Sequence, residues 1–267
     1  MTKSALTSVA NDLRAARASL GIALYLGSAA AIEIAGLWGL DFAFIDTEHS
    51  SSAIDEHMEK LILAAHLSGI APLVRVRGTV EWEIRKVLEF GAAGVLIPQV
   101  HTADQMREIM KAARFPPHGR RGADASVRSA SYAGRGFTWR GYIEESNKQP
   151  LVIPMAESFE FFENIDAILD VPGVDVVSFG PLDYALSKGL PPDAPMSNPE
   201  VVEKTKELID KCHIRGIKVM APCIPSSNES AANLLALGVD MLILGTDVMF
   251  LNQGCQRARE IAEAVRG

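Results

Sequence analysis

The stretch Asp41-Phe-Ala-Phe-Ile-Asp-Thr-Glu-His-Ser50 joins a short apolar run to a group of titratable side chains. The run from Phe42 to Ile45 contains aromatic and β-branched residues, which predicts a buried β-strand. Asp46, Glu48 and His49 follow directly, so this strand would end in two carboxylates and an imidazole. Such a strand end is either a solvated turn or part of a functional site. Two later strands also end in charged groups, which favours the site.

Apolar runs of this kind recur along the chain and alternate with helical stretches. Strands are predicted at residues 22–26, 42–46, 72–77, 94–98, 151–155, 174–179, 218–221 and 240–244. Helices are predicted at residues 29–37, 54–67, 82–90, 103–113, 159–169, 199–215, 228–237 and 248–265. Strict alternation indicates parallel strands joined by helical crossovers. We therefore predict an α/β fold, a (β/α)8 TIM barrel, as one domain over residues 1–267.

Two further features bear on this prediction. No Gly-x-Gly-x-x-Gly follows the first strand, which weighs against an open dinucleotide-binding sheet. Two connections, residues 115–139 and 182–198, are predicted as long loops, and long loops in a compact domain are often functional or contact a partner.

The composition excludes several classes of protein. With 48% hydrophobic and 22% charged residues, the chain has ordinary globular composition. Its net charge of -7 argues against general affinity for nucleic acid or for an anionic membrane. The three cysteines form no metal-type pair or disulfide framework, which suits the reducing cytoplasm. Residues 1–21 have charges throughout and do not form a signal peptide, and no transmembrane span is predicted.

In a TIM barrel the active site lies at the carboxyl ends of the strands. The polar residues predicted there are Asp46, Glu48, His49, Arg75, Arg77, Gln99, His101, Glu157, Asp183 and Asp247. Carboxylates, an imidazole and a guanidinium on neighbouring strands suit a hard cation and an anionic substrate. Glu157 and Asp183 suit Mg²⁺ or Mn²⁺, which take few carboxylates and keep other positions for water and substrate. Each of them alone is more often only a carboxylate on a loop.

The lysines argue against chemistry through an imine. A Schiff-base aldolase needs a lysine at the catalytic end of the barrel. Lys218 opens its predicted strand and Lys148 precedes its strand, so both belong to the opposite end. Lys188 lies within a polar loop.

Several motifs together resemble the HpcH/HpaI aldolase family, the metal-dependent class II pyruvate aldolases, which include 4-hydroxy-2-oxoheptanedioate and 2-dehydro-3-deoxyglucarate aldolases. The resemblance covers nearly the whole chain. It is carried by Gly39-Leu-Asp-Phe-Ala-Phe-Ile-Asp-Thr-Glu-His49, Val74-Arg-Val76, Leu88-Glu-Phe-Gly-Ala-Ala-Gly-Val-Leu-Ile-Pro98, Arg114-Phe-Pro-Pro-His-Gly-Arg-Arg-Gly122, Val171-Pro-Gly-Val-Asp175 and Phe179-Gly-Pro-Leu-Asp183. Asp-x-Glu-His and the later Gly-Pro-x-Asp are the most specific pair.

The resemblance implies a TIM barrel of the phosphoenolpyruvate/pyruvate-binding type. It also implies reversible cleavage of a 4-hydroxy-2-oxo acid to pyruvate and an aldehyde, through an enolate stabilised by Mg²⁺, Mn²⁺ or Co²⁺. Glu157 and Asp183 would be the metal ligands, and His49 the acid/base residue with Asp46 as its partner. Arg75 would lie against the 2-oxo group. The backbone of Gly180, Pro181, Leu182 and Asp183 would cradle the substrate carboxylate.

The resemblance further implies a homo-oligomer, a trimer or hexamer in which neighbours exchange their last helices. Three positions depart from the family pattern. Met155 stands where Gln is common, Tyr184-Ala185 replaces Leu-Ser, and Asp124 replaces a common glycine. The first two departures flank the implied metal site and bear on substrate scope.

Three other functions remain open from the sequence. An oxaloacetate decarboxylase would use the same enolate, and a citrate-lyase-type thioester lyase would need a surface for coenzyme A. A non-catalytic barrel that binds a metabolite is the third. The presence of His49, Arg75, Glu157 and Asp183 argues against this last possibility.

Overall fold

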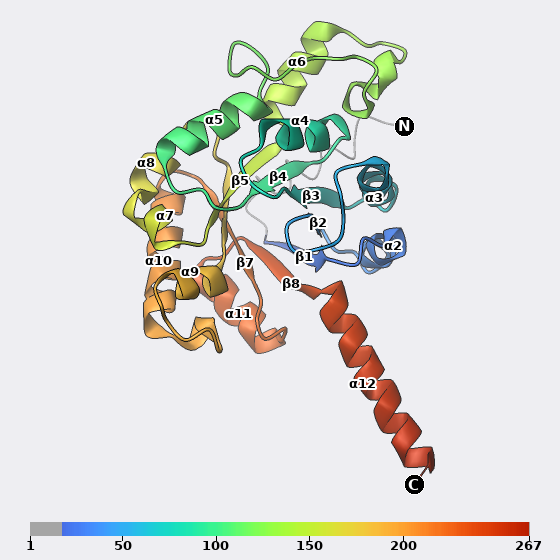
Figure 1. Ribbon diagram of the computed structural model, residues 1–267, viewed down its shortest axis with the longest axis vertical. Coiled ribbons are helices and arrows are strands. Elements are labelled where there is room, and N and C mark those ends of the chain that lie inside the picture. The colour runs from blue at the N-terminus through green and yellow to red at the C-terminus, as the bar shows by residue number, and fades with distance from the viewer. Residues whose placement is uncertain (1–17, 267) are drawn as a thin grey trace.

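The computed structural model describes residues 18–266, and its strands close into a barrel (Figure 1). The strands are β1 (Ser19–Leu24), β2 (Phe42–Asp46), β3 (Ala71–Arg75), β4 (Gly94–Ile97), β5 (Leu151–Ala156), β6 (Val176–Phe179), β7 (Lys218–Pro222) and β8 (Met241–Thr246). Each strand pairs in parallel with the next, and β8 pairs in parallel with β1. The predicted TIM barrel is confirmed. Most of residues 1–21, for which no signal peptide was predicted, lie outside the described residues.

All eight predicted helices are present within the described residues. The helices are α2 (Ala29–Leu37), α3 (Glu56–Leu67), α4 (Glu81–Glu89), α5 (Ala103–Ala113), α6 (Trp139–Lys148), α7 (Phe159–Glu163), α8 (Ile165–Leu169), α9 (Pro181–Ser187), α10 (Pro199–Ile214), α11 (Asn228–Leu237) and α12 (Asp247–Arg266). The helix predicted at 159–169 is broken at Asn164 into α7 and α8, and the Asn164 side chain donates to the backbone oxygens of His101 and Glu160. The chain also forms the 3-10 turns η1 (Arg128–Ala133) and η2 (Pro195–Ser197).

Helices α6 and α9 were not predicted. The apolar residues of α6 are confined to its first half, at Trp139, Tyr142 and Ile143, and only Tyr142 is buried, so the helical period is short. Helix α9 begins with Pro181 at its first turn and occupies the start of the predicted loop 182–198. Pro at this position is favourable because its missing N–H needs no partner there.

Strand β1 is also displaced from its prediction, because it begins at Ser19 and ends at Leu24 rather than covering 22–26. Its extension past Leu24 is prevented by a side chain. The backbone N–H groups of Tyr25 and Leu26 donate to the Asp247 carboxylate instead of continuing the ladder with β2.

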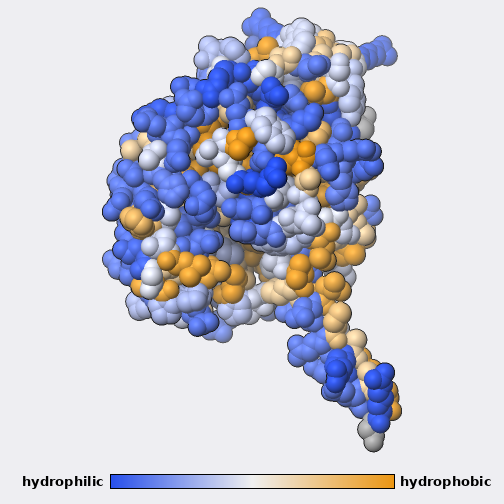
Figure 2. Space-filling model, in the orientation of Figure 1, coloured by the Kyte–Doolittle hydropathy of each residue, from blue (hydrophilic) through white to orange (hydrophobic). Residues whose placement is uncertain are grey.

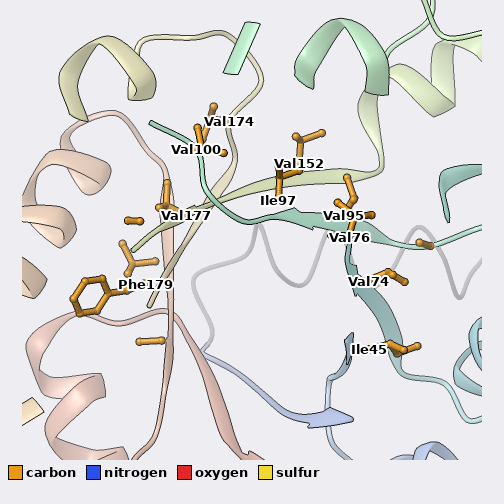
Figure 3. Close-up of a cluster of buried hydrophobic side chains, with 14 of the residues drawn as sticks. Ile45, Val74, Val76, Val95, Ile97, Val100, Val152, Val174, Val177 and Phe179 are labelled. Carbon is orange, nitrogen blue, oxygen red and sulfur yellow. The ribbon is translucent and has the colours of Figure 1, made fainter. Parts of the chain in front are cut away.

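The core has two layers, and the alternation of strand side chains decides which layer each residue enters. Phe42 and Phe44 of β2 point into the barrel, where they pack with Leu73 of β3 and other strand residues. Ala43 and Ile45 point outward, into the layer between the strands and the helices. Figure 3 shows part of this outer layer. The same alternation makes the last residues of β2 and β3 inward-facing at the barrel mouth.

Helix α12 leaves the barrel instead of covering it (Figure 1). After Asp247, no residue of α12 up to Arg266 is buried. Figure 2 shows hydrophobic residues gathered where α12 leaves the barrel and along the helix itself. Exposed apolar residues of α12 are Val248, Phe250, Leu251, Ile261 and Val265.

No helix within residues 18–266 has the length and apolar character needed to cross a membrane.

Candidate active site

The centre of the site is an ion pair between the last residues of two neighbouring strands. Asp46 of β2 lies opposite Arg75 of β3 in the strand register. Arg75 Nε donates to Asp46 Oδ1 at 2.6 Å, and the side chains are only 6% and 0% exposed. Because the inner face of β2 and β3 is otherwise apolar, this pair marks the end of the core and the floor of the barrel mouth.

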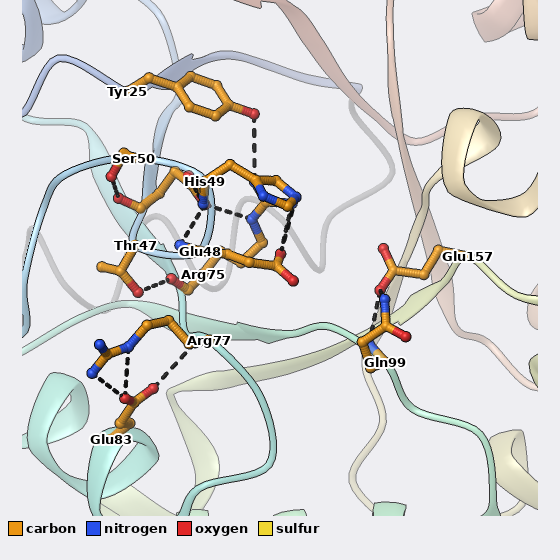
Figure 4. Close-up of polar contacts among 11 residues, drawn as sticks. Tyr25, Thr47, Glu48, His49, Ser50, Arg75, Arg77, Glu83, Gln99 and Glu157 are labelled. Atoms are coloured by element: carbon orange, nitrogen blue, oxygen red, sulfur yellow. Dashed lines mark hydrogen bonds and ion pairs between the residues drawn. The ribbon is translucent and has the colours of Figure 1, made fainter. Parts of the chain in front are cut away.

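Asp46 also shapes the loop that follows β2, in which Glu48 and His49 lie near Arg75 (Figure 4). Its Oδ1 accepts from the Glu48 backbone N–H at 3.1 Å and its Oδ2 accepts from the His49 backbone N–H at 2.8 Å. Asp46 was expected to be the partner of the His49 ring, but the contact that the structure shows is to the His49 backbone. The reason is that a short Asp side chain in this turn reaches the amides two and three residues ahead.

Glu48 is the carboxylate beside the imidazole. Its Oε2 lies 3.8 Å from His49 Nε2 and 3.1 Å from Arg75 Nη1. Burial raises the pKa of Glu48, while the charges of Arg75 and His49 act in the opposite direction. The sequence analysis placed Glu48 at this strand end but gave it no role. The signal that could have found Glu48 was its place in the Asp-x-Glu-His motif, one of the two most specific motifs.

Glu157 follows β5 and is 3% exposed. Its Oε1 accepts from the Gln99 backbone N–H at 2.7 Å and from Gln99 Nε2 at 3.3 Å. Burial raises the pKa of Glu157 to about 7; the Gln99 N–H lowers it, and the charges of Asp183 and Glu48 raise it further. Because Arg75 ends β3, Glu48 follows β2, Glu157 follows β5 and Asp183 follows β6 of one parallel barrel, all four groups lie at the same mouth.

Two backbone features make room for Glu157. Gln99 has a left-handed φ of 56°, which aims its N–H at the carboxylate and is uncommon for a residue other than glycine. Gly180 needs to lack a side chain, because a Cβ there would lie 2.7 Å from Glu157 Cβ and 3.1 Å from Oε2. The Gly180 of the Gly-Pro-x-Asp motif therefore has a packing reason.

Asp183 lies in the first turn of α9, which begins at Pro181 directly after β6. It is half-buried, whereas Leu182 is exposed. Backbone N–H groups in the first turn of a helix lack partners within the helix, so they are available to an anion. The structure thus brings together Asp46, His49, Arg75, Glu157 and Asp183, with the segment from Gly180 to Asp183 beside them.

The departures from the family pattern differ in position. Met155 is buried, and it pairs with Ser178 in the strand register. Tyr184 is 1% exposed, and its ring packs on Phe162 at 5.0 Å. Its hydroxyl donates to Glu200. Tyr184 therefore belongs to the layer between barrel and helices.

The other polar residues predicted at the strand ends have partners elsewhere. Arg77 binds Glu83 of α4, with Nη2 2.5 Å from Oε1. His101 Nδ1 bonds the Ser158 hydroxyl at 3.2 Å. Asp247 binds the backbone after β1.

Within residues 18–266, no group of three or more His, Cys, Asp or Glu side chains is arranged to hold a metal ion. Two carboxylates nonetheless fit such an ion when substrate and water supply the remaining ligands. The raised pKa of Glu157 has the sign expected of a site that needs a cation, since its surroundings disfavour the charged form.

Comparison with known proteins gives one consistent result. The family model described as HpcH/HpaI aldolase/citrate lyase matches residues 21–254. A 2-keto-3-deoxy-L-rhamnonate aldolase of Klebsiella pneumoniae is 34% identical over 243 residues, covering 90% of this chain and 88% of that protein. The crystal structure of an HpcH/HpaI aldolase from Desulfitobacterium hafniense has a TM-score of 0.87 at 26% identity, covering 95% of both chains. The citrate synthase SbnG has a TM-score of 0.82 at 27% identity and the same coverage.

Proposed function

The chain belongs to the HpcH/HpaI aldolase/citrate lyase family, and on that premise we propose how its site works. As a member it is a pyruvate-dependent aldolase, a carbon–carbon lyase that cleaves a 2-oxo acid to pyruvate and an aldehyde. We propose a 4-hydroxy-2-oxo acid as its substrate class. The carrying observation is that Glu157 and Asp183 follow β5 and β6 at the same end of the barrel at which Arg75 ends β3 and Glu48 follows β2.

Glu157 and Asp183 would hold a divalent cation, Mg²⁺, Mn²⁺ or Co²⁺. Such a cation would polarise the 2-oxo group of the substrate and stabilise the negative charge that develops as the bond between C3 and C4 breaks. The Gln99 N–H fixes one oxygen of Glu157, so the other oxygen, which faces Gly180, is the one free to act as a ligand.

Arg75 orients the substrate and stabilises developing charge. A guanidinium has five N–H donors in a rigid fork. Asp46 occupies Nε and Glu48 lies against Nη1, which leaves further N–H groups of Arg75 for the 2-oxo oxygen. Because its partners already fix the fork, little reorganisation is needed as the charge develops. The backbone from Gly180 to Asp183 would bind the substrate carboxylate.

His49 moves the proton. Its side chain is 63% exposed, so it can reach the C4 hydroxyl of a substrate in the mouth, directly or through one water. Glu48 lies beside Nε2 and would keep the ring in place, in the role first expected for Asp46. Asp46 acts on the backbone of the same loop and on Arg75.

The test is release of pyruvate from 4-hydroxy-2-oxo acids of different aldehyde length, with the metal varied. Metal-dependent pyruvate release is expected, and its absence with every such substrate would contradict the proposal. Oxaloacetate is included because a decarboxylase would use the same enolate. Faster turnover of oxaloacetate than of every hydroxy acid would favour that function instead.

We also propose that the chain assembles as a trimer or hexamer through α12. The helix carries an apolar stripe at three- and four-residue spacing, formed by Val248, Leu251, Cys255, Ala258, Ala262 and Val265. Since α12 lies away from its own barrel, a neighbouring copy is the surface that would cover this stripe. Light scattering of the full chain tests the assembly. Leu251→Glu should reduce the mass, and Gln253→Glu on the opposite face should leave it unchanged.

We also propose that the enzyme acts in the cytoplasm, and its cysteines support this proposal. Cys212, Cys223 and Cys255 are free thiols, and Cys255 is exposed. An exposed thiol of this kind suits a reducing compartment.

A further inference from the structure

Asp247 is a buried carboxylate at the junction between β8 and α12. It is 8% exposed, and both of its oxygens accept from the two residues that follow β1. Oδ1 accepts from the Tyr25 N–H at 2.9 Å, and Oδ2 accepts from the Leu26 N–H at 3.0 Å. Oδ1 also accepts from the Val248 N–H at 2.8 Å, at the start of α12. One carboxylate therefore ties the end of β1 to the start of the last helix.

These bonds decide where Tyr25 lies. The ladder between β1 and β2 ends at Leu24, so no strand pairing holds the next two residues. Two charge-assisted bonds from one buried carboxylate replace it, and such bonds are stronger than neutral ones. A neutral amide at position 247 would offer a single acceptor oxygen for the two N–H groups.

Tyr25 continues the inward alternation of β1 and packs against the apolar residues inside the barrel. Its hydroxyl lies 3.5 Å from Arg75 Nη2 (Figure 4). This separation is at the long limit of a hydrogen bond, where a small displacement decides whether the bond exists. The interaction between Tyr25 and Arg75 is thus sensitive to the position of the Tyr25 backbone.

Arg75 then has one partner on each nitrogen: Asp46 on Nε, Glu48 on Nη1 and Tyr25 on Nη2. The first two are anionic and lie on the β2 side. Tyr25 is the neutral partner and approaches from β1. It limits the rotation of the fork on the side that the two carboxylates do not reach.

We propose that Asp247 is a positioning residue for the aldolase reaction: through the Tyr25 and Leu26 amides it holds the Tyr25 hydroxyl against Arg75. The inference rests on the role proposed above for Arg75. It adds a link between the active site and α12, because the same carboxylate forms the first turn of that helix. Thr246 strengthens the junction, since its hydroxyl accepts from the Met249 N–H at 3.0 Å.

A double-mutant cycle on the full-length, metal-loaded enzyme tests the link. Asp247→Asn and Tyr25→Phe should each lower kcat/KM by about tenfold, and mainly through kcat, because Arg75 acts on charge that develops during reaction. The double variant should be no slower than the slower single variant, since both act through one contact. Asp41→Asn is the matched control. Its Oδ2 accepts from the Leu20 N–H at the opposite end of β1, and the substitution should leave kcat/KM within about twofold.

The proposed function is checked first, by turnover of the wild-type enzyme and its loss in Arg75→Ala. Failure there contradicts the assignment of Arg75 and not the role of Asp247. With that premise met, an Asp247→Asn enzyme that keeps wild-type kcat/KM overturns the inference, as do losses that multiply in the double variant. If Asp247→Asn does not fold, Tyr25→Phe carries the test, because it keeps both backbone bonds. A tenfold loss in Tyr25→Phe supports the inference, and an unchanged kcat/KM overturns it.

Discussion

The carboxylates in the two halves of the barrel mouth have different partners. At the ends of β2 and β3, each carboxylate lies against Arg75, and Asp46 also accepts two backbone N–H groups. At the ends of β5 and β6, Glu157 accepts hydrogen bonds from Gln99 alone among residues 18–266, and the charge of Asp183 raises the pKa of Glu157 further. The arginine half pairs its charges within the protein, whereas the charge of the carboxylate half would be balanced by the proposed cation. In the proposed mechanism, the proton-transfer half at β2 and β3 is held by contacts within the protein. The half at β5 and β6 would be completed by the metal and the substrate.

The largest effect should come from removing the carboxylate half. Glu157→Gln or Asp183→Asn should lower turnover by roughly 10³-fold or more, because the cation contributes several kcal/mol of charge stabilisation. Circular dichroism should show an intact barrel, since both residues lie on its rim. EDTA should have the same effect, and Mg²⁺, Mn²⁺ or Co²⁺ should reverse it.

The control for this prediction is Asp175→Asn, which changes a carboxylate immediately before β6, at the opposite end of the barrel from Asp183, and should remain active. Full activity in EDTA would contradict the comparison between the two halves. So would inactivation by borohydride in the presence of pyruvate, which indicates a lysine imine.

The arginine half should be probed at His49. His49→Ala should lower kcat by roughly 10²- to 10⁴-fold, the range for loss of a general acid or base. Metal affinity, measured by titration calorimetry, should stay near the wild-type value because no contact joins His49 to Glu157 or Asp183 among the described residues. Equal losses of metal affinity and activity would instead make His49 a ligand.

The buried charge of Glu157 should also affect how the free energy of unfolding depends on pH. The folded-state pKa of Glu157, about 7, lies above its ordinary value of 4.5, so the folded protein binds more protons than the unfolded chain between these values. The contribution of Glu157 is therefore favourable below pH 4.5 and is lost as the pH rises through 7. The shift corresponds to on the order of 3 kcal/mol, because each pKa unit is about 1.4 kcal/mol.

Melting curves of the metal-free protein measure this contribution. The wild type should lose stability relative to Glu157→Gln as the pH rises from about 5 to 8. Added Mn²⁺ should restore the wild type at pH 8 and have no such effect on the variant. A variant that is less stable than the wild type at pH 8 without metal would mean that the Glu157 charge is compensated after all.

The alternation of strand residues explains how much of this could be predicted from the sequence. The eight strands, and hence the barrel, could be predicted because each strand is an apolar run. The runs are apolar throughout because alternate residues enter the inner and the outer layer of the core. Asp46 and Arg75 follow from the same alternation, since each ends an inward-facing series. The residues of the Gly-Pro-x-Asp motif are explained by a contact, because Gly180 leaves space for Glu157.

What could not be predicted depends on contacts between distant loops. Gln99 reaches Glu157 across 58 positions of sequence, from a residue with a left-handed backbone that the sequence does not reveal. Asp247 reaches Tyr25 across 222 positions and ends β1 earlier than its apolar run suggests. Which of Asp46 and Glu48 lies beside the His49 ring depends on which carboxylate folds back onto its own turn, and residue type alone does not decide this.

The smallest effect on turnover is expected from Glu48→Gln, which distinguishes the role of Glu48 from that of Asp46 beside Arg75. The glutamine keeps an oxygen for Arg75 Nη1 but removes the negative charge 3.8 Å from His49 Nε2. We expect kcat to fall by about tenfold with an unchanged melting temperature, since one contact of a carboxylate with an exposed ring contributes on the order of 1 kcal/mol. Glu160→Gln is the matched control, because Glu160 Oε2 lies 3.7 Å from His101 Nδ1 and makes no contact with Arg75.

Asp46→Asn should instead lower the melting temperature, because Asp46 is fully buried and bonded to Arg75 and to two amides. If Glu48→Gln kept full activity and Asp46→Asn lost activity without loss of stability, Asp46 would be the partner of His49, as the family resemblance implies. The loop would then have to rearrange during turnover.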